Sequence, residues 1–291
     1  MNNPFRLDND RDYQLWREQK LVDYPQTVDE LTVSLSAAQA SEEELRQLVS
    51  VIDKTNLALY RVANPDLADK VFVRQLGQAL GLERLDGNLC ADEDDITSLQ
   101  VVDSGRHSGY IPYTSRRLSW HTDGYYNTPE QQIRAIVMHC AQPAANGGEN
   151  LLLDHEVVYI QLRDENPRYI KALMADDAMA IPPNTENGEE IRGWQSGPVF
   201  SVHQQTGALH MRYTARTRNI KWADDEVTRE AVAFIDACLK PDNPYVFKHR
   251  LAAGEGIICN NVLHNRTGFE DDSRHKRLLY RARYFDRVAA T

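Results

Sequence analysis

The spacing of apolar positions divides the chain into a helical first third and a strand-rich remainder. Residues 1 to about 30 are polar and mixed, which predicts a surface extension with little structure of its own. A first helix should begin at the capping-box pair Ser41 and Glu44. A second should cover residues 66–80 and end at Gly81. The apolar residues of the first helix recur at roughly helical spacing: Leu45, Leu48, Val51, Ile52 and Leu57.

From Ser98 onward the apolar period shortens to that of strands, and Gly, Ser and Pro separate the segments. Two helical stretches interrupt them, one from residue 154 to about 174 with a break near Pro167, the other over 224–239. A turn is predicted at 146–150 and a hairpin around 204–207. The predicted strands cover residues 99–102, 110–113, 133–140, 151–153, 199–202, 209–213, 245–249, 256–260 and 277–285.

The segment 182–190 has the composition of neither a helix nor a strand, so we predict a lid around residues 182–198. No internal repeat, low-complexity tract or Ser/Gly linker divides the chain. We therefore expect a single domain over residues 1–291. Its first 97 residues would form mainly an N-terminal extension and a helical packing layer, and residues 98–291 the reactive core.

Charge and composition narrow the classes of function. The formal net charge is -10, and no stretch gathers enough Lys and Arg to follow a phosphate backbone, which argues against a nucleic-acid partner. The N-terminus is polar, and no apolar run approaches about 18 residues. These features predict a cytoplasmic protein with no membrane partner. Four widely spaced cysteines lack the pairing of a zinc or redox motif and are predicted to be buried, reduced thiols: Cys90, Cys140, Cys238 and Cys259.

The strongest chemical signal is the segment around His121 and Asp123, because alternate residues of a strand project from the same face. With His264, about 140 residues later, they could form a 2-His-1-carboxylate triad, which leaves three positions open on a ferrous ion. A lone His-x-Asp is expected about once by chance in such a chain. The remaining histidines are predicted to be surface or hydrogen-bonded core residues: His107, His139, His155, His203, His210, His249 and His275.

The final predicted strand carries a row of arginines. Arg277, Leu279, Arg281 and Arg283 should share one face of it. At about 3.3 Å per residue, Arg277 and Arg281 would lie roughly 13 Å apart and could bind two different anions beside one central site. The alternative is a solvated outer face, and the alternation alone favours that alternative.

Together these residues resemble the TauD/TfdA family of Fe(II)- and 2-oxoglutarate-dependent dioxygenases. That family's pattern is His-x-Asp, a distal His, and an Arg roughly 10 to 14 residues beyond it. The segment Trp120-His-Thr-Asp-Gly124, the Gly147-Gly148-Glu149 turn and the segment from Leu209 to Thr214 support the likeness, which covers residues 98 to the C-terminus. The resemblance implies an α+β fold with a double-stranded β-helix core, a cupin-like jelly roll, and flanking helices. It also makes a homo-oligomer an expectation.

The resemblance assigns His121, Asp123 and His264 to Fe(II), and Arg277 to the distal carboxylate of the co-substrate 2-oxoglutarate. Asn150 stands where many members carry a Thr that helps to hold 2-oxoglutarate. The implied reaction uses O2 and couples oxidative decarboxylation of 2-oxoglutarate, to succinate and CO2, with oxidation of a C–H bond. Hydroxylation is the default outcome.

Arg281 would face a small anionic substrate, and Arg212 and Arg216 are further candidates for the same role. Aromatic residues near the iron-binding strand could wall a pocket, although some could equally be core or rim residues: Tyr113, Trp120, Tyr125 and Tyr126. Two rival classes stay open. One is a metal-dependent hydrolase that uses the same His/Asp/His site, and the other is a non-catalytic ligand-binding jelly roll.

Overall fold

The computed structural model describes residues 3–36, 39–87, 92, 94–102, 110–186 and 188–288. The predictions for Cys90 and His107 lie outside these residues. Contacts within the chain define two compact units. The first comprises Met1–Tyr24, Trp120–Gln132 and Leu153–Val246, and the second comprises Pro25–Ser119, Ile133–Leu152 and Phe247–Thr291.

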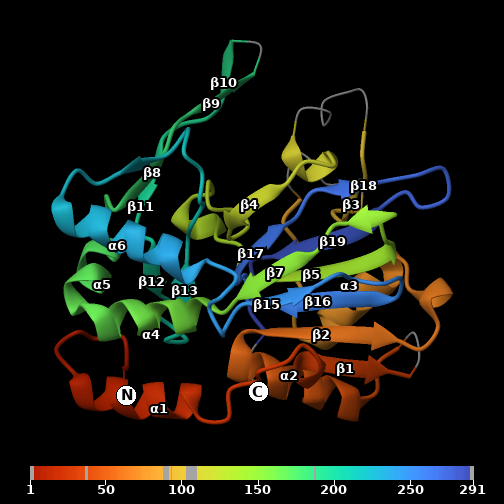
Figure 1. Cartoon of the computed structure of the whole chain (residues 1–291), viewed down its shortest axis with the longest axis horizontal. Helices are drawn as coiled ribbons and strands as arrows, with labels where there is room; N and C mark the ends of the chain where they lie inside the picture. Colours follow the sequence, from red (N-terminus) through yellow and green to blue (C-terminus); the bar gives the residue numbers. More distant parts are fainter. Residues whose placement is uncertain are drawn as a thin grey trace. The chain divides into compact units, whose positions relative to one another are not determined.

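A six-stranded sheet forms the centre of the second unit (Figure 1). Among its described pairings, only that of Thr32–Leu35 with Leu57–Val62 is parallel, and the others run antiparallel. The first 97 residues therefore do more than form the predicted helical layer, because they supply two strands of this sheet and the first residue of a third. The order across the sheet is β1 (Thr32–Leu35), β2 (Leu57–Val62), β16 (Glu255–Cys259), β5 (Ala135–Gln142), β19 (Leu278–Tyr284) and β3 (Thr97–Leu99).

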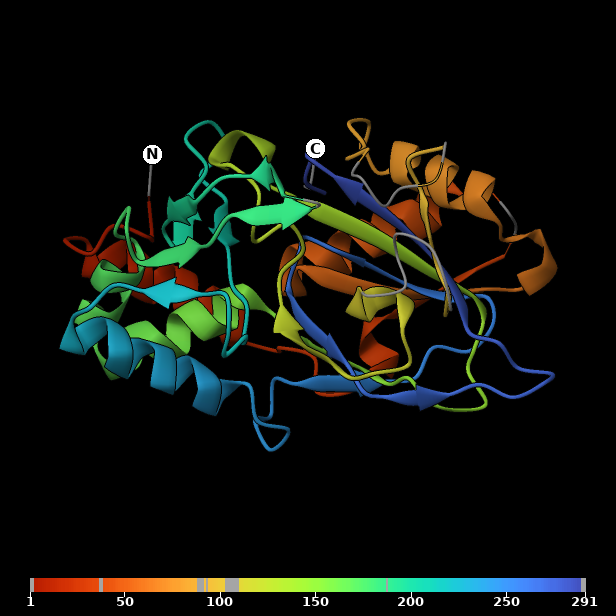
Figure 2. The ribbon, with the colours of Figure 1, turned by 90° about the horizontal axis from the view of Figure 1, so that it is seen from above.

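Two helices, α2 (Glu42–Thr55) and α3 (Lys70–Ala79), cover one face of this sheet (Figure 2). The predicted capping box is confirmed, since the Ser41 and Glu44 side chains each bond the other's backbone N–H. Leu57 was wrongly included in the helix. Asn56 adopts a left-handed conformation with φ of 58°, which ends the helix and starts β2. Buried side chains shared by helices and strands form this core: Leu48, Ile52, Phe72, Val73, Leu76, Tyr60, Val137, Ile258, Ala282 and Tyr284.

A four-stranded sheet follows the order β15 (Phe247–His249), β7 (Asn150–Leu153), β17 (Leu263–Arg266) and β4 (Leu118–His121). A separate two-stranded antiparallel sheet consists of β6 (Asn146–Gly147) and β18 (Phe269–Glu270). The strand predicted at 110–113 is wrong. That segment forms the 3-10 helix Ile111–Tyr113, which suits Pro112 because proline has no N–H to donate to a sheet. The other 3-10 turns are Asp29–Leu31, Pro65–Leu67 and Pro129–Gln131.

Helices dominate the first unit. The predicted break at Pro167 is confirmed, since it begins α5 (Pro167–Leu173) after α4 (His155–Glu165), and α6 (Glu226–Cys238) packs against both. The prediction of an unstructured start is wrong, because α1 covers Asp10–Leu21. Asn9 caps this helix, which buries Tyr13 and Lys20. The helix was not predicted because its sequence is mostly polar and only these two residues are buried.

The first unit also holds short strands. A sheet of order β11 (Gln195–Gly197), β8 (Met179–Ile181), β14 (Lys221–Trp222) lies beside the predicted hairpin of β12 (Phe200–Val202) and β13 (Leu209–Met211). The segment 182–190 is not irregular as predicted. It builds a second hairpin from β9 (Asn184–Glu186) and β10 (Glu189–Arg192), which extends beyond β8 and β11 in Figure 1. A lid function for this hairpin stays a prediction.

The cysteine prediction is confirmed for Cys140, Cys238 and Cys259, which are buried thiols outside any disulfide. Burial raises the pKa of both Cys140 and Cys238 to about 12, so neither is a reactive thiolate. Each helix in the described ranges is too short or too polar to span a lipid bilayer. The mixture of helices and largely antiparallel sheets agrees with the predicted α+β class at this coarse level.

Candidate active site

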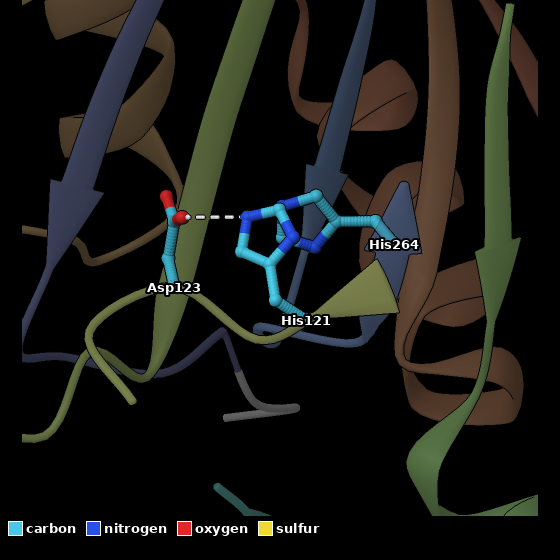
Figure 3. A group of neighbouring side chains, drawn as sticks. All are labelled: His121, Asp123 and His264. Atoms are coloured by element: carbon cyan, nitrogen blue, oxygen red, sulfur yellow. Dashed lines mark ion pairs between the residues drawn. The ribbon is translucent and has the colours of Figure 1, made fainter. Parts of the chain in front are cut away.

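His121 and Asp123 sit at the end of a strand, where the chain turns. The predicted strand geometry holds only as far as His121, since β4 ends there and Asp123 lies in the following turn. Thr122 fixes this turn by two bonds to Tyr213: its N–H donates to the Tyr213 carbonyl, and its Oγ1 accepts from the Tyr213 N–H, both at 3.0 Å. The side chains of His121 and Asp123 still converge, with Nε2 and Oδ1 3.4 Å apart (Figure 3).

His264 lies on β17 with its ring oriented by the backbone. Its Nδ1 is 2.9 Å from the carbonyl oxygen of Val262. A carbonyl can only accept, so Nδ1 carries the proton and Nε2 keeps a lone pair for a metal. One potential ligand atom from each of His121, Asp123 and His264 falls within 4.8 Å of the others. Two imidazole nitrogens and one carboxylate oxygen form the donor set of a 2-His-1-carboxylate iron site, so these residues fit Fe(II).

The second unit contains a cavity whose wall includes His264 and the predicted co-substrate residues Arg277 and Asn150, together with Arg281. Strand alternation explains this placement: along β5, Ala135 and Val137 join the helix-covered core, whereas Ile136 and Met138 line the cavity. The remaining lining residues come from both sheets and their connections: Leu99, Pro112, Leu118, Leu152, Ile257, Cys259, Asn265 and Arg266.

The arginines in β19 and directly before it occupy two different environments. Arg277 is only 5% exposed, so the alternative of a solvated outer face is wrong for it. The strand register shifts between Leu278 and Leu279, yet both Arg277 and Arg281 line the cavity. Arg283 does not join them, because it forms a buried ion pair with Asp86.

A second arginine, Arg266, was missed by the sequence analysis. It lies two residues after His264 on the same strand, a spacing that could have indicated it. Arg266 and Arg277 both contact the Phe269 ring, with guanidinium carbons 4.7 and 5.1 Å from its centroid. Arg266 also donates to the Thr114 and Arg116 carbonyls, which fixes the chain before β4.

The positive charges on the wall of this cavity favour the binding of an anion. Burial lowers the pKa of Arg277 to about 10. Burial and the nearby Arg277 charge together lower the pKa of Arg266 to about 9. Both arginines therefore stay protonated at neutral pH. Arg277 Nη1 and Arg266 Nε are buried without a hydrogen-bond partner. The turn at Gly147 and Gly148, with φ of 70° and 75°, lies against Arg277: a Cβ at Gly148 would be 3.7 Å from Arg277 Nε. Unsatisfied buried guanidinium donors fit a carboxylate ligand.

Three of the other residues predicted to contact the substrate, Trp120, Tyr125 and Arg212, lie in the first unit. Trp120 and Tyr125 are both buried, and the Tyr125 ring meets that of His121 edge to face at 6.5 Å. Arg212 is buried too, but three of its N–H groups already donate to backbone carbonyls. The acceptors are Tyr125 at 2.7 Å, Met179 at 3.0 Å and Gln195 at 2.6 Å. Its geometry is that of a residue that ties three segments together.

Comparison with known proteins agrees with this chemistry. Residues 22–283 match the family model "Taurine catabolism dioxygenase TauD, TfdA family". Two relatives are each called uridine-5'-phosphate dioxygenase. The one from Amycolatopsis sp is 28% identical over 192 residues, covering 64% of this chain and 66% of the relative. The one from Streptomyces sp is 29% identical over 202 residues, covering 67% and 71%. The chain thus spans about two thirds of the length of these relatives.

Among solved structures, an asparagine oxygenase in complex with Fe(II), 2S,3S-3-hydroxyasparagine and succinate superposes with a TM-score of 0.60. The identity is 14%, and the match covers 87% of this chain and 93% of the oxygenase, so it shows a shared fold. The chain belongs to the TauD/TfdA dioxygenase family. It is accordingly an Fe(II)- and 2-oxoglutarate-dependent oxygenase that uses O2, which confirms the predicted class and cofactors.

Proposed function

We propose that this enzyme oxidises, by default hydroxylates, a C–H bond of a small anionic organic substrate while 2-oxoglutarate is decarboxylated to succinate and CO2. One observation carries the proposal. His264, a member of the metal-binding trio, lines the same cavity as Arg277, whose buried guanidinium has a donor left for an anion. We further infer that the two sheets around this cavity form a jelly-roll core, and that residues 1–291 act as one catalytic domain.

Each residue has a defined task in this proposal. His121, Asp123 and His264 hold Fe(II), and the Nδ1 bond to the Val262 carbonyl keeps the His264 ring oriented. Arg277 binds the distal carboxylate of 2-oxoglutarate through its planar fork, and Asn150, buried on the cavity wall, donates a further hydrogen bond. When bound, iron and 2-oxoglutarate together activate O2 for C–H oxidation.

The substrate is proposed to carry a phosphate. Two observations support this proposal. Both relatives are called uridine-5'-phosphate dioxygenase, and several arginines lie near the proposed site. Arg281 on the cavity wall is the proposed contact to the substrate in the second unit. Trp120 and Tyr125 provide buried aromatic surface beside the metal-binding turn. The match of residues 22–283 to the dioxygenase family disfavours a metal-dependent hydrolase.

Succinate formation tests this function directly. The purified protein is supplied with ferrous ion, 2-oxoglutarate, air and uridine 5'-phosphate, and succinate is measured. We expect His264→Ala to reduce turnover at least a hundredfold because one metal ligand is lost, an effect that is more severe than the roughly 10- to 100-fold cost of losing an outer-shell partner. His275→Ala, which removes an exposed histidine, is the matched control and should retain full activity.

Failure to form succinate with any added substrate, in a protein that binds ferrous ion, would exclude the dioxygenase function. Hydrolysis of uridine 5'-phosphate without consumption of 2-oxoglutarate would instead favour the hydrolase.

A further inference from the structure

Two arginines flank a pair of tyrosines beside the proposed metal site. Tyr125 and Tyr126 meet edge to face, with ring centroids 5.1 Å apart. The guanidinium carbon of Arg216 lies 5.3 Å from the Tyr125 centroid, and that of Arg192 lies 5.3 Å from the Tyr126 centroid. All four residues belong to the first unit, so their arrangement rests on contacts within one compact body.

Backbone pairing holds these arginines in place. Arg216 follows a segment that pairs with the metal-binding strand: His121 forms a β-bridge with Thr214, and the Ala215 N–H donates to the Trp120 carbonyl at 2.8 Å. Arg192 ends strand β10 of the hairpin, and its Nη2 donates to the Pro182 carbonyl at 2.8 Å. Arg192 and the β9–β10 hairpin were both missing from the sequence predictions. The hairpin brings Arg192 to the ring of Tyr126.

The Arg192 and Arg216 guanidinium groups have no counter-ion within the described part of the chain. Among the residues that the structure describes, neither arginine forms an ion pair with a carboxylate, and Arg192 Nε is buried without a hydrogen-bond partner. Burial is the main cause that lowers the pKa of Arg192; Tyr125 and Tyr126 oppose it, and the like charge of Arg216 makes the smallest contribution, which also lowers the pKa. Two neighbouring cations without a carboxylate repel each other, and an anion placed between them would relieve that repulsion.

The spacing between the His121 ring and the arginines suits a small molecule. The Tyr125 ring contacts the His121 ring at 6.5 Å and the Arg216 guanidinium at 5.3 Å, so one aromatic side chain separates the metal ligand from the cation. A substrate of a few rings or fewer could place an anionic group on the arginines and a C–H bond near the metal. The tyrosine faces supply flat surface for a ring between these points.

Resting on the proposed function, we infer that Arg192 and Arg216 bind the phosphate group of the primary substrate, with Tyr125 and Tyr126 against its organic part. Arg216 was one of three arginine candidates, and the structure separates it from Arg212. Arg212 holds the Tyr125 carbonyl together with β8 and β11, and so acts as a positioning residue for the tyrosine pair.

Inorganic phosphate is the simplest probe, because it needs no knowledge of the organic part. Its binding to the holoprotein, loaded with ferrous ion and 2-oxoglutarate under anaerobic conditions, can be followed by the ultraviolet difference spectrum of the tyrosines. We expect Arg192→Gln and Arg216→Gln each to weaken phosphate binding about tenfold, because each removes charge-assisted hydrogen bonds. Arg229→Gln, at an exposed arginine of α6, is the matched control and should bind phosphate like the wild type.

The same titration with uridine 5'-phosphate and with uridine tests the assignment to substrate. The two arginine variants should lose affinity for the phosphate ester and not for uridine. Wild-type protein that binds phosphate no better than Arg192→Gln would overturn the inference, and so would equal losses for uridine and its phosphate. The absorption band of the iron and 2-oxoglutarate complex, recorded in the same samples, reports on the proposed function separately.

Discussion

Two clusters of buried charged side chains in this molecule differ in whether the protein supplies a counter-charge. In the first unit, Lys20 is almost fully buried, and its Nζ lies 2.7 Å from Asp154 and 2.6 Å from Glu156. In the second unit, Arg266 and Arg277 are equally buried, yet they share an aromatic ring and keep donors without partners. A buried charge that the protein neutralises itself is structural. One that the protein leaves unneutralised indicates a site for a ligand of opposite charge.

The largest expected effect is on stability, at the neutralised group. Lys20→Met leaves two carboxylates buried without their cation, which should cost about 3 to 5 kcal/mol in the free energy of unfolding. Although burial opposes the charged form, the nearby carboxylates raise the pKa of Lys20, so Lys20 is charged at neutral pH. Urea unfolding measures the change. Arg229→Met, which breaks the exposed pair with Asp224, should stay within about 1 kcal/mol of the wild type.

A third buried titratable group, the imidazole of His139, is kept neutral by the protein. His139 is fully buried on β5, with Nδ1 3.1 Å from the Tyr60 hydroxyl, and burial lowers its pKa from 6.5 to about 4. Between these values the unfolded chain binds a proton that the folded chain does not, so stability should fall as the pH drops from about 6.5 to 4. The loss should approach about 3 kcal/mol.

Unfolding free energies across this pH range measure that loss. His139→Gln should flatten the dependence, whereas His275→Gln, at an exposed position, should leave it as it is in the wild type. Equal slopes in wild type and His139→Gln would show that other groups cause the acid sensitivity.

The variant with the smallest expected change in the free energy of unfolding, Arg277→Gln, should have the clearest effect on function. Arg277→Gln removes a buried, incompletely bonded cation, so it should leave the free energy of unfolding unchanged or raise it by about 1 kcal/mol. The affinity for 2-oxoglutarate should fall about 10- to 100-fold, in line with about 1.5 to 3 kcal/mol for hydrogen bonds to a charged group. Calorimetry with 2-oxoglutarate measures the affinity. A strongly destabilised variant with normal 2-oxoglutarate affinity would place Arg277 with Lys20 as a structural charge.

Local pattern predicted most of the elements that carry the site. The capping box at Ser41, the break at Pro167 and the Gly-Gly turn beside Arg277 all depend on short-range chemistry that the sequence displays directly. The His-x-Asp segment was predicted for a partly wrong reason, since Asp123 lies in a turn and not in the strand. Its geometry depends on Thr122 and Tyr213, which are distant in the sequence.

The features that were missed depend on long-range contacts. The residues of α1 give little helical pattern, because its anchors are a tyrosine and a lysine that finds its carboxylates on another element. Likewise, the polar segment 182–190 forms a hairpin that places Arg192 over Tyr126. Arg212 and Arg216 were indistinguishable in sequence, since only the folded chain shows which one has backbone carbonyls as partners.

An anaerobic titration of 2-oxoglutarate into the ferrous protein tests the central claim most directly. Chelation of 2-oxoglutarate by iron beside Arg277 predicts a visible absorption band that requires both metal and co-substrate. The band should be lost in His264→Ala and Asp123→Ala and retained in His275→Ala. Saturable binding of 2-oxoglutarate without any such band in the ferrous wild-type protein, or a normal band in both ligand variants, would contradict the assignment of this site.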